Sequence, residues 1–183
     1  MPTPMRIETP RLVLRDFEED DWRAIHAYAV LEAVWRNMEW GPNTEADTKN
    51  FVARARALAV AEPRTWFELA IARKETGAVI GAVGVRVRDP SARAGDLGYA
   101  LHPDAWGQGF ATEAARAVRD LGFGTLGLHR LHANCWPENP ASARVLEKIG
   151  MRFEGRLRHV MHARGAWRDT LLFAMVESDP RPG

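Results

Sequence analysis

The sequence predicts a single α/β (α+β) domain in which helices flank a mixed, mostly antiparallel and twisted sheet. Seven short runs rich in β-branched, aromatic and aliphatic residues read as strands, and helical patterns separate only some of them. A doubly wound dinucleotide fold needs a helix after nearly every strand, so this order of elements argues against it. With 183 residues and 46% hydrophobic side chains, the chain can bury one core without disulfides or a structural metal.

The expected elements follow in order along the chain. A strand at 11–15 leads into an acidic helix start at 18–21, and helical residues then extend from 22 to 58, with a break at Gly41-Pro42 and a cap at Thr44. Strands are expected at 66–72, 78–87, 96–102, 131–136, 152–161 and 167–176, and helices at 111–121 and 141–149. The domain should span 1–177, with 178–183 as a frayed tail.

Composition narrows the possible functions. Twenty-five basic and 24 acidic side chains give a formal net charge of +1, which provides no general field for nucleic acid or an anionic membrane. No segment reaches the roughly 20 apolar residues of a membrane span, and residues 1–15 lack a secretory signal. Cys135 is the only cysteine, which excludes a disulfide and suits a reducing compartment. We therefore expect a cytoplasmic protein with no direct nucleic-acid or membrane partner.

The stretch 101–114, LHPDAWGQGFATEA, is the most informative in the chain. Gly107 and Gly109 lack Cβ atoms, so the backbone between a strand and a helix can approach a ligand closely, and N–H groups at the helix start can hold anionic oxygens. A P-loop would need Gly-Lys-Ser/Thr, and the dinucleotide fingerprint would need a small residue at Thr112. The pattern indicates a pyrophosphate site, although a tight turn without a ligand would use the same glycines.

A second cassette, NPASARVLEKIGMRF, occupies 139–153. Asn139 suits a helix N-cap, Pro140 the first helical position and Gly150 a C-terminal stop, so capping alone accounts for these three residues. In this order, however, the two cassettes resemble the coenzyme-binding motifs of the GNAT superfamily of N-acetyltransferases. Residues 8–15, 153–158 and 165–169 resemble the opening and closing segments of its bacterial ribosomal-protein-alanine (Rim-type) branch, so the resemblance covers almost the whole chain.

The resemblance implies a sheet splayed between its fourth and fifth strands, with acetyl coenzyme A in the gap as co-substrate. Backbone groups near Leu101 and His102 would bind the pantetheine arm, and a strand bulge there would supply the oxyanion N–H. The implied pyrophosphate residues are Gly107, Gln108, Gly109, Phe110, Ala111 and Thr112, and Asn139 and Ser142 would face the thioester. The family usually has Gln or Arg where this chain has Trp106.

The implied reaction is acetyl transfer to a primary amine, either a protein N-terminus or a small molecule, and a homodimer is possible. Asp96 is the candidate base, directly or through water, because related enzymes often carry Glu before the Gly-Tyr pair. Ser142 is the candidate proton donor, because Leu146 stands where the family often has tyrosine. Alternatively, Asp96 is an exposed strand-start carboxylate and Ser142 a local hydrogen-bond partner.

Other functions are weaker. A non-catalytic acyl-coenzyme A-binding module or a structural dimerisation partner would use the same scaffold. His129 with His132, and His159 with His162, would place their rings on opposite faces of an extended strand, so we expect no metal. Tyr99 and Cys135 are expected in the core. The aromatic and acidic residues around Gly41-Pro42 suit a pocket for a cationic amine, although an exposed helix face looks the same; they are Trp35, Glu39, Trp40, Glu45 and Asp47.

Overall fold

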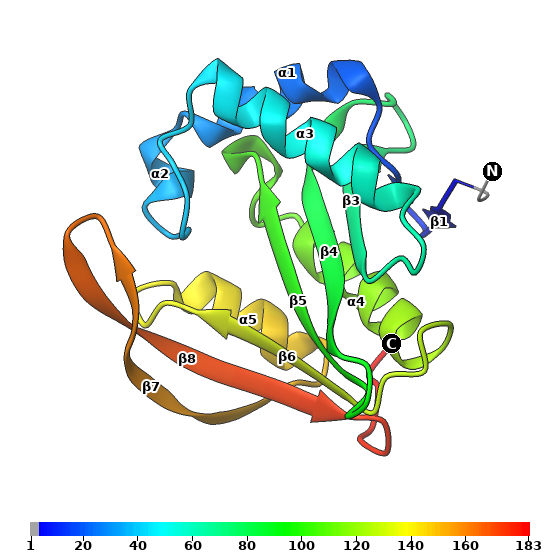
Figure 1. Ribbon diagram of the computed structural model, residues 1–183, viewed down its shortest axis with the longest axis vertical. Coiled ribbons are helices and arrows are strands. Elements are labelled where there is room, and N and C mark those ends of the chain that lie inside the picture. Colours follow the sequence, from blue (N-terminus) through cyan, green and yellow to red (C-terminus); the bar gives the residue numbers. More distant parts are fainter. Residues whose placement is uncertain (1–3) are drawn as a thin grey trace.

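The computed structural model describes residues 4–183, which form one eight-stranded sheet covered by helices on both faces (Figure 1). The strands are β1 (Arg6–Glu8), β2 (Leu12–Arg15), β3 (Trp66–Arg73), β4 (Val79–Asp89), β5 (Ala94–Leu101), β6 (Arg130–Cys135), β7 (Arg152–Ala163) and β8 (Ala166–Val176). The α-helices are α1 (Trp22–Ala29), α2 (Glu32–Trp35), α3 (Glu45–Ala59), α4 (Phe110–Phe123) and α5 (Pro140–Lys148).

The sheet has the order β1-β2-β3-β4-β5-β6-β8-β7 and is antiparallel except between β5 and β6. These two parallel strands pair only where Ala94–Asp96 meets Arg130–His132. Beyond that point they separate, and Figure 1 shows β5 rising toward α1 while β6 and β8 turn away. β5 and β6 are the fourth and fifth of the strands expected from the sequence, so the predicted sheet and its splay are confirmed.

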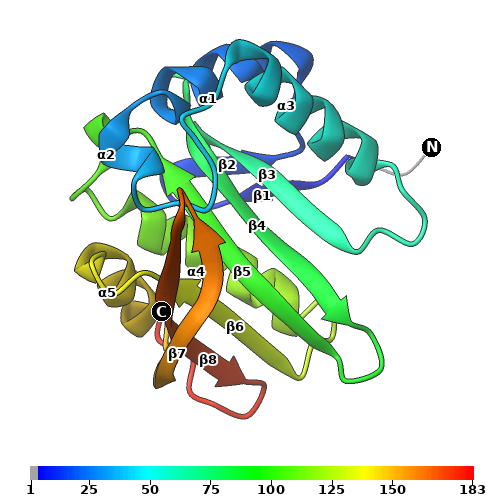
Figure 2. The same ribbon diagram turned by 60° about the vertical axis from the view of Figure 1, so that its left-hand side comes forward.

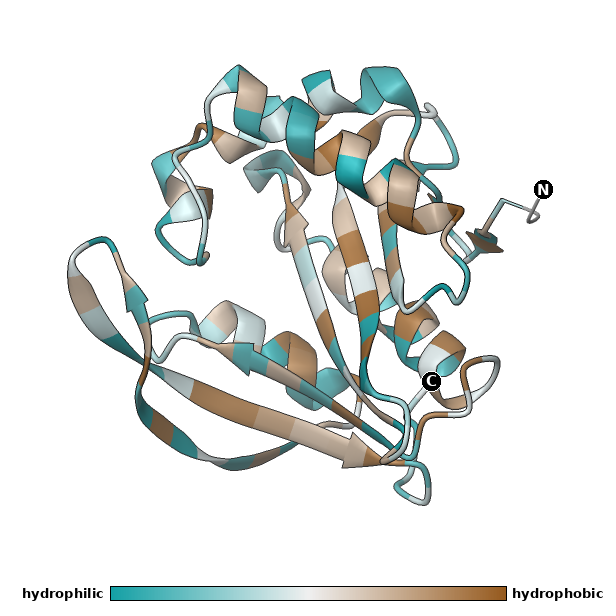
Figure 3. Ribbon diagram, in the orientation of Figure 1, coloured by the Kyte–Doolittle hydropathy of each residue, from teal (hydrophilic) through white to brown (hydrophobic). Residues whose placement is uncertain are grey.

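Apolar side chains line both faces of the central strands. On one face, Leu69 and Val83 pack with Val118 of α4, and α5 lies beside α4 on this side (Figure 2). On the other face, Ala70 and Ala82 pack with Tyr28 of α1 and with α3. Figure 3 shows brown segments along the central strands and teal segments on the outer helices. Among residues 4–183 no helix is both long and apolar enough to cross a membrane.

The sequence-based boundaries agree closely with the observed elements. Thr44 caps α3 as expected: its hydroxyl accepts from the Asp47 amide at 3.1 Å, and the Asp47 carboxylate accepts from the Thr44 amide at 2.9 Å. The short strand β1 was missed, because three residues at a sheet edge are too few to show a period of two.

The C-terminal residues, for which the sequence predicts fraying, lie against the body of the fold in the structure. Arg119 of α4 is 3% exposed, and its guanidinium donates to the carbonyl oxygens of Ile149 at 2.8 Å and Pro182 at 3.0 Å. The Arg181 guanidinium lies 5.2 Å from the centre of the Phe123 ring. These contacts give the last residues defined partners.

Candidate active site

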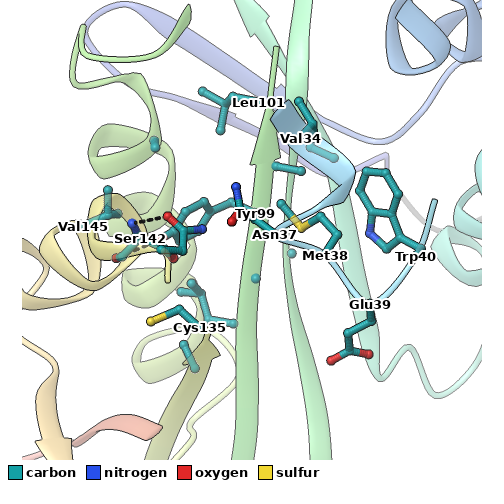
Figure 4. Close-up of a pocket in the computed structure, with 18 of the residues that line it drawn as sticks. Val34, Asn37, Met38, Glu39, Trp40, Tyr99, Leu101, Cys135, Ser142 and Val145 are labelled. Atoms are coloured by element: carbon teal, nitrogen blue, oxygen red, sulfur yellow. Dashed lines mark hydrogen bonds between the residues drawn. The ribbon is translucent and has the colours of Figure 1, made fainter. Parts of the chain in front are cut away.

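A cavity of about 1250 Å³ opens where β5 and β6 separate, and residues from both faces of the sheet line it. Figure 4 shows Tyr99 and Ser142 on one side of β5, and Met38, Glu39 and Trp40 on the other. The turn before α4 forms part of the wall. The splay therefore produces one continuous space with an α4–α5 side and an α1–α3 side.

The turn between β5 and α4 has the geometry of an anion site. Gly107 and Gly109 have φ values of +73° and +81°, which side chains rarely tolerate, and Gly109 is the N-cap of α4. Within residues 4–183, no protein acceptor lies in hydrogen-bond range of the backbone N–H groups of 107–112. Five of these six residues line the cavity, the exception being Gln108, whose side chain donates to the Asp104 carbonyl at 2.6 Å. The turn therefore offers free N–H groups at the positive end of a helix dipole.

Trp106, the departure from the family pattern, has a structural function. Its indole Nε1 donates to the Leu101 carbonyl at 2.9 Å and so closes the turn that leads to Gly107. His102 also acts locally: its Nδ1 accepts from the Asp104 amide at 3.2 Å.

The backbone N–H groups of Tyr99 and Leu101 at the end of β5 point into the cavity without the expected bulge. β4 and β5 pair in unbroken register from Val87 to Gly81, and the only shift in this pair lies between Val87 and Asp89. The His102 amide donates to β4, so alternation turns the N–H groups of Tyr99 and Leu101 toward the gap. The bulge prediction is wrong for this chain: the splay itself leaves these groups free.

Ser142 and Asn139 meet at the start of α5. The Asn139 side-chain oxygen accepts from the Ser142 amide at 3.1 Å, as a helix cap does, and both residues line the cavity. The Ser142 hydroxyl lies 2.9 Å from the hydroxyl of Tyr99, a residue that sequence analysis left out of the site. Burial raises the pKa of Tyr99, which keeps its hydroxyl protonated. Leu146 is 1% exposed and packs in the core.

Asp96 lies on the opposite face of β5 from Tyr99, so the structure does not bring Asp96 and Ser142 together. Its carboxylate is held by two arginines of β4, with Arg86 Nε at 3.4 Å and Arg88 Nε in direct contact. Asp96 also pairs in register with His132 of β6, at the point where the strands separate. The predicted base thus lies in the cavity wall within an ion-pair cluster.

Glu68 is a cavity residue that the sequence analysis missed. It lies on β3 and is half-buried, and its carboxylate accepts from the Trp66 indole at 2.8 Å. Burial raises the pKa of Glu68 to about 7, an effect that Asp96 adds to and that Trp66 and Arg54 oppose. A lone carboxylate among the otherwise apolar residues 66–72, WFELAIA, is the signal that could have identified it.

The residues around Gly41-Pro42 that were predicted to form an acceptor pocket fall into two groups, those that line the cavity and those that do not. Glu39, Trp40 and Asp47 line the cavity. Glu45 pairs with Lys49 on the surface of α3, and Trp35 instead lies beneath Arg164, 5.1 Å from its guanidinium.

Arg164 ties the β7–β8 hairpin to the segment after α2. Its Nη2 donates to the carbonyl oxygens of Met38 at 2.8 Å and Trp40 at 3.1 Å, and also to that of Trp35. The hairpin and the α2 segment, which lie far apart in sequence, therefore meet beside the cavity (Figure 1).

The structure also places the second histidine pair and the cysteine, and Cys135 lines the cavity. His159 and His162 do not face opposite ways: β7 shifts register between Leu157 and Met161, and both rings pack on Trp167, at 6.5 and 5.2 Å. Burial raises the pKa of Cys135 to about 11, so its thiol is neutral and poorly nucleophilic.

Comparisons with known proteins agree with this architecture. A family model described as an acetyltransferase (GNAT) domain matches residues 11–152. The uncharacterized N-acetyltransferase YnaD of Bacillus subtilis is 32% identical over 175 residues, covering 96% of this chain and 99% of YnaD. The crystal structure of a GNAT-family acetyltransferase from Bacillus anthracis is also 32% identical, with a TM-score of 0.84, covering 94% of this chain and 99% of that chain. The ribosomal protein uS5-alanine N-acetyltransferase of Escherichia coli is 33% identical over 87 residues, covering 48% of this chain and 45% of that enzyme.

The protein is thus an acyltransferase that depends on acetyl coenzyme A. It belongs to the GNAT acetyltransferase family, because both the family model and a relative of 32% identity span most of the chain.

Proposed function

We propose that this enzyme transfers acetyl from acetyl coenzyme A to a primary amine that enters from the α1–α3 side of β5. The observation that supports this most directly is the cavity itself, which continues from the free amides of 107–112, past the open edge of β5, to the side that carries Glu39, Trp40 and Glu68.

The coenzyme fits the α4–α5 side of the cavity. Free N–H groups before α4 would hold the pyrophosphate, and the N–H groups of Tyr99 and Leu101 would pair with the pantetheine amides. Asn139 and Ser142 would then lie near the thioester. The glycines at 107 and 109 keep side chains away from the phosphates.

The acceptor side suits an amine that is positively charged in solution. Carboxylates of Glu39, Asp47 and Glu68 line it, together with the aromatic rings of Trp40 and Trp66. The uS5-alanine enzyme, a partial match, is named for an alanine acceptor on a protein. We infer an acceptor that is either a protein N-terminus or a small primary amine. A homodimer and a cytoplasmic location remain predictions.

The proposed chemistry needs a base for the amine and a proton for the departing thiolate. On the α4–α5 side, the Ser142 hydroxyl, in contact with Tyr99, is the proposed proton donor. On the α1–α3 side, two of the carboxylates that line the cavity lie on the sheet itself, Glu68 on β3 and Asp96 on β5. Asp96 is the base proposed from the sequence. Because its carboxylate already pairs with two arginines, Glu68 is the alternative candidate for the base.

Two measurements test the proposal. Acetyl coenzyme A at a hundred times its dissociation constant should stabilise the fold by about 2.7 kcal/mol, which a thermal-shift assay detects. Coenzyme A release should then be measured against a panel of N-terminal peptides, polyamines and small amines. Stabilisation together with release for at least one primary amine is the expected result. Release with none of them, despite clear coenzyme binding, would contradict the proposed function.

A further inference from the structure

Three rows of paired residues cross β3, β4 and β5 on the α1–α3 face, and their side chains differ sharply in size. The row Ala70, Ala82, Ala100 lies under α1 and α3. The row Trp66, Arg86, Asp96 lies farthest from these alanines and carries bulky and charged groups. Between them, Glu68 pairs with Gly84, which pairs with Gly98.

The middle row forms a groove with a carboxylate at one end. A Cβ on Gly84 would lie 2.8 Å from Glu68 Oε2, so the carboxylate lies directly over β4 and needs glycine beneath it. A Cβ on Gly98 would meet no atom within 4 Å, so the space beside the carboxylate is open as far as β5. Glu68, Gly84 and Gly98 all line the cavity.

This groove ends close to where the thioester is expected. Gly98 lies one residue from Tyr99, whose N–H faces the coenzyme side, whereas Asp96 lies two residues, about 6–7 Å, further from that end of β5. Glu68 Oε2 also accepts a hydrogen bond from Trp66, which holds the carboxylate in place. Glu68 is thus held beside the expected position of the thioester, whereas the Asp96 carboxylate forms ion pairs with Arg86 and Arg88.

We propose that Glu68 is the catalytic carboxylate that receives the acceptor's ammonium group and takes its proton, and that the amine lies over Gly84 and Gly98. The inference rests on the proposed function and assigns the base within it. The ammonium gives one proton to Glu68, and its freed lone pair forms the N–C bond. The C–S bond breaks with its electrons on sulfur, the second N–H proton reaches the thiolate, and Glu68 returns its proton to solvent. Asp96, in this assignment, is a positioning residue.

The charged and titratable groups around Glu68 agree with this role. Arg54 of α3 and Arg86 of β4 lie on the Trp66 ring, at 4.8 and 4.6 Å, rather than in an ion pair with Glu68. Tyr28 of α1 and Asp96 of β5 complete the surroundings, and the Asp96 charge favours the protonated form of Glu68. A carboxyl that titrates near neutral pH is well matched to proton transfer from an amine.

The test compares kcat/KM across about pH 5.5 to 9 for one acceptor identified in the panel, with thiol release followed by a reagent active in acid, such as a dithiodipyridine. Wild type should show a rate that rises through an apparent pKa near 7. Glu68→Gln should lower kcat/KM by about 100-fold or more and lose this rise, and Glu68→Asp should restore it in part. Asp96→Asn should keep the rise. Glu75→Gln, on the exposed β3–β4 turn, is the matched control.

Two further readouts separate the possible outcomes. Glu68→Gln should keep the acetyl coenzyme A thermal shift, which shows that it folds, and should raise KM less for an aromatic amine that carries no ammonium. Gly98→Ala should fold normally but raise the acceptor KM. If wild type is active and Glu68→Gln retains the rise near pH 7, or Asp96→Asn removes it, the assignment of Glu68 is overturned. If wild type acetylates no amine, the proposed function fails and this inference fails with it.

Discussion

Glu68 gives the clearest link between a single residue and a measurable property of the protein. Its pKa is raised from 4.5 to about 7 in the folded state, mainly by burial. Between pH 4.5 and about 7, the folded protein binds more protons than the unfolded chain. The stability that Glu68 contributes is therefore fully present below pH 4.5 and is lost as the pH rises through 7. The loss amounts to at most about 3.5 kcal/mol, because one pKa unit corresponds to about 1.4 kcal/mol.

Glu68→Gln should therefore stabilise the protein more at pH 8 than at pH 5, because glutamine does not ionise and its side-chain oxygen can still accept from Trp66. Urea unfolding at the two pH values measures the difference, with Glu75→Gln as control. An equal effect at both pH values would show that Glu68 titrates normally in the folded state.

Ser142 and Tyr99 form a second residue-scale unit, a hydroxyl pair 2.9 Å apart. If the thiolate receives its proton through this pair, Ser142→Ala and Tyr99→Phe should each lower kcat, by at most about tenfold, because a thiolate with a pKa near 8.5 is a tolerable leaving group. The double variant should be little worse than either single one, since both interrupt the same path. Steady-state kinetics on all four proteins tests this, and fully additive losses would argue against a shared path.

At the scale of elements, a glycine in the turn before α4 can be tested for two separate effects, relief of backbone strain and binding of the coenzyme. Gly107 and Gly77 have nearly equal φ values, +73° and +72°, and a Cβ at either would meet no atom within 4 Å. Alanine should therefore cost each site about 1–2 kcal/mol of stability through backbone strain alone. Only Gly107 lies in the cavity wall.

Gly107→Ala should in addition weaken acetyl coenzyme A binding by tenfold or more, because a methyl group and a strained backbone disturb the free amides. Gly77→Ala should leave coenzyme affinity unchanged. Thermal unfolding and calorimetric titration of both variants provide the comparison. Equal coenzyme affinity in the two would remove the turn from the binding site.

The same elements show what sequence could and could not predict. Period-two runs, the Thr44 cap and the glycine turn have local causes, so the strands other than β1, the start of α3 and the turn before α4 could be placed from residues alone. A lone carboxylate in an apolar segment could have drawn attention to Glu68, but its place over Gly84 depends on cross-strand pairing. The contact of Tyr99 with Ser142, on a helix more than 40 residues away, has no local signal at all. The Asp96 ion pairs depend on register between β4 and β5, which no local pattern specifies.

At the scale of the whole molecule, the site depends on two halves of the sheet that meet only briefly. β5 and β6 share three paired residues, Ala94–Asp96 with Arg130–His132, and then diverge. One half carries Glu68 and the free edge of β5, and the other carries β6, β8 and β7. We expect this pairing to set the width of the cavity at one end, and the contact of Arg164 with the segment after α2 to set it at the other.

Arg164→Ala should therefore loosen the acceptor side without unfolding the protein. Loss of the donors to Met38 and Trp40 should raise the acceptor KM several-fold and leave coenzyme affinity unchanged. It should also speed hydrogen exchange in residues 35–40, because the segment loses the side chain that anchors it and opens more often. Arg158→Ala, an exposed arginine on the same hairpin, controls for lost charge. Hydrogen exchange by mass spectrometry and steady-state kinetics measure these two effects. Unchanged exchange at 35–40 together with an unchanged acceptor KM would mean that β5–β6 pairing alone holds the cavity open.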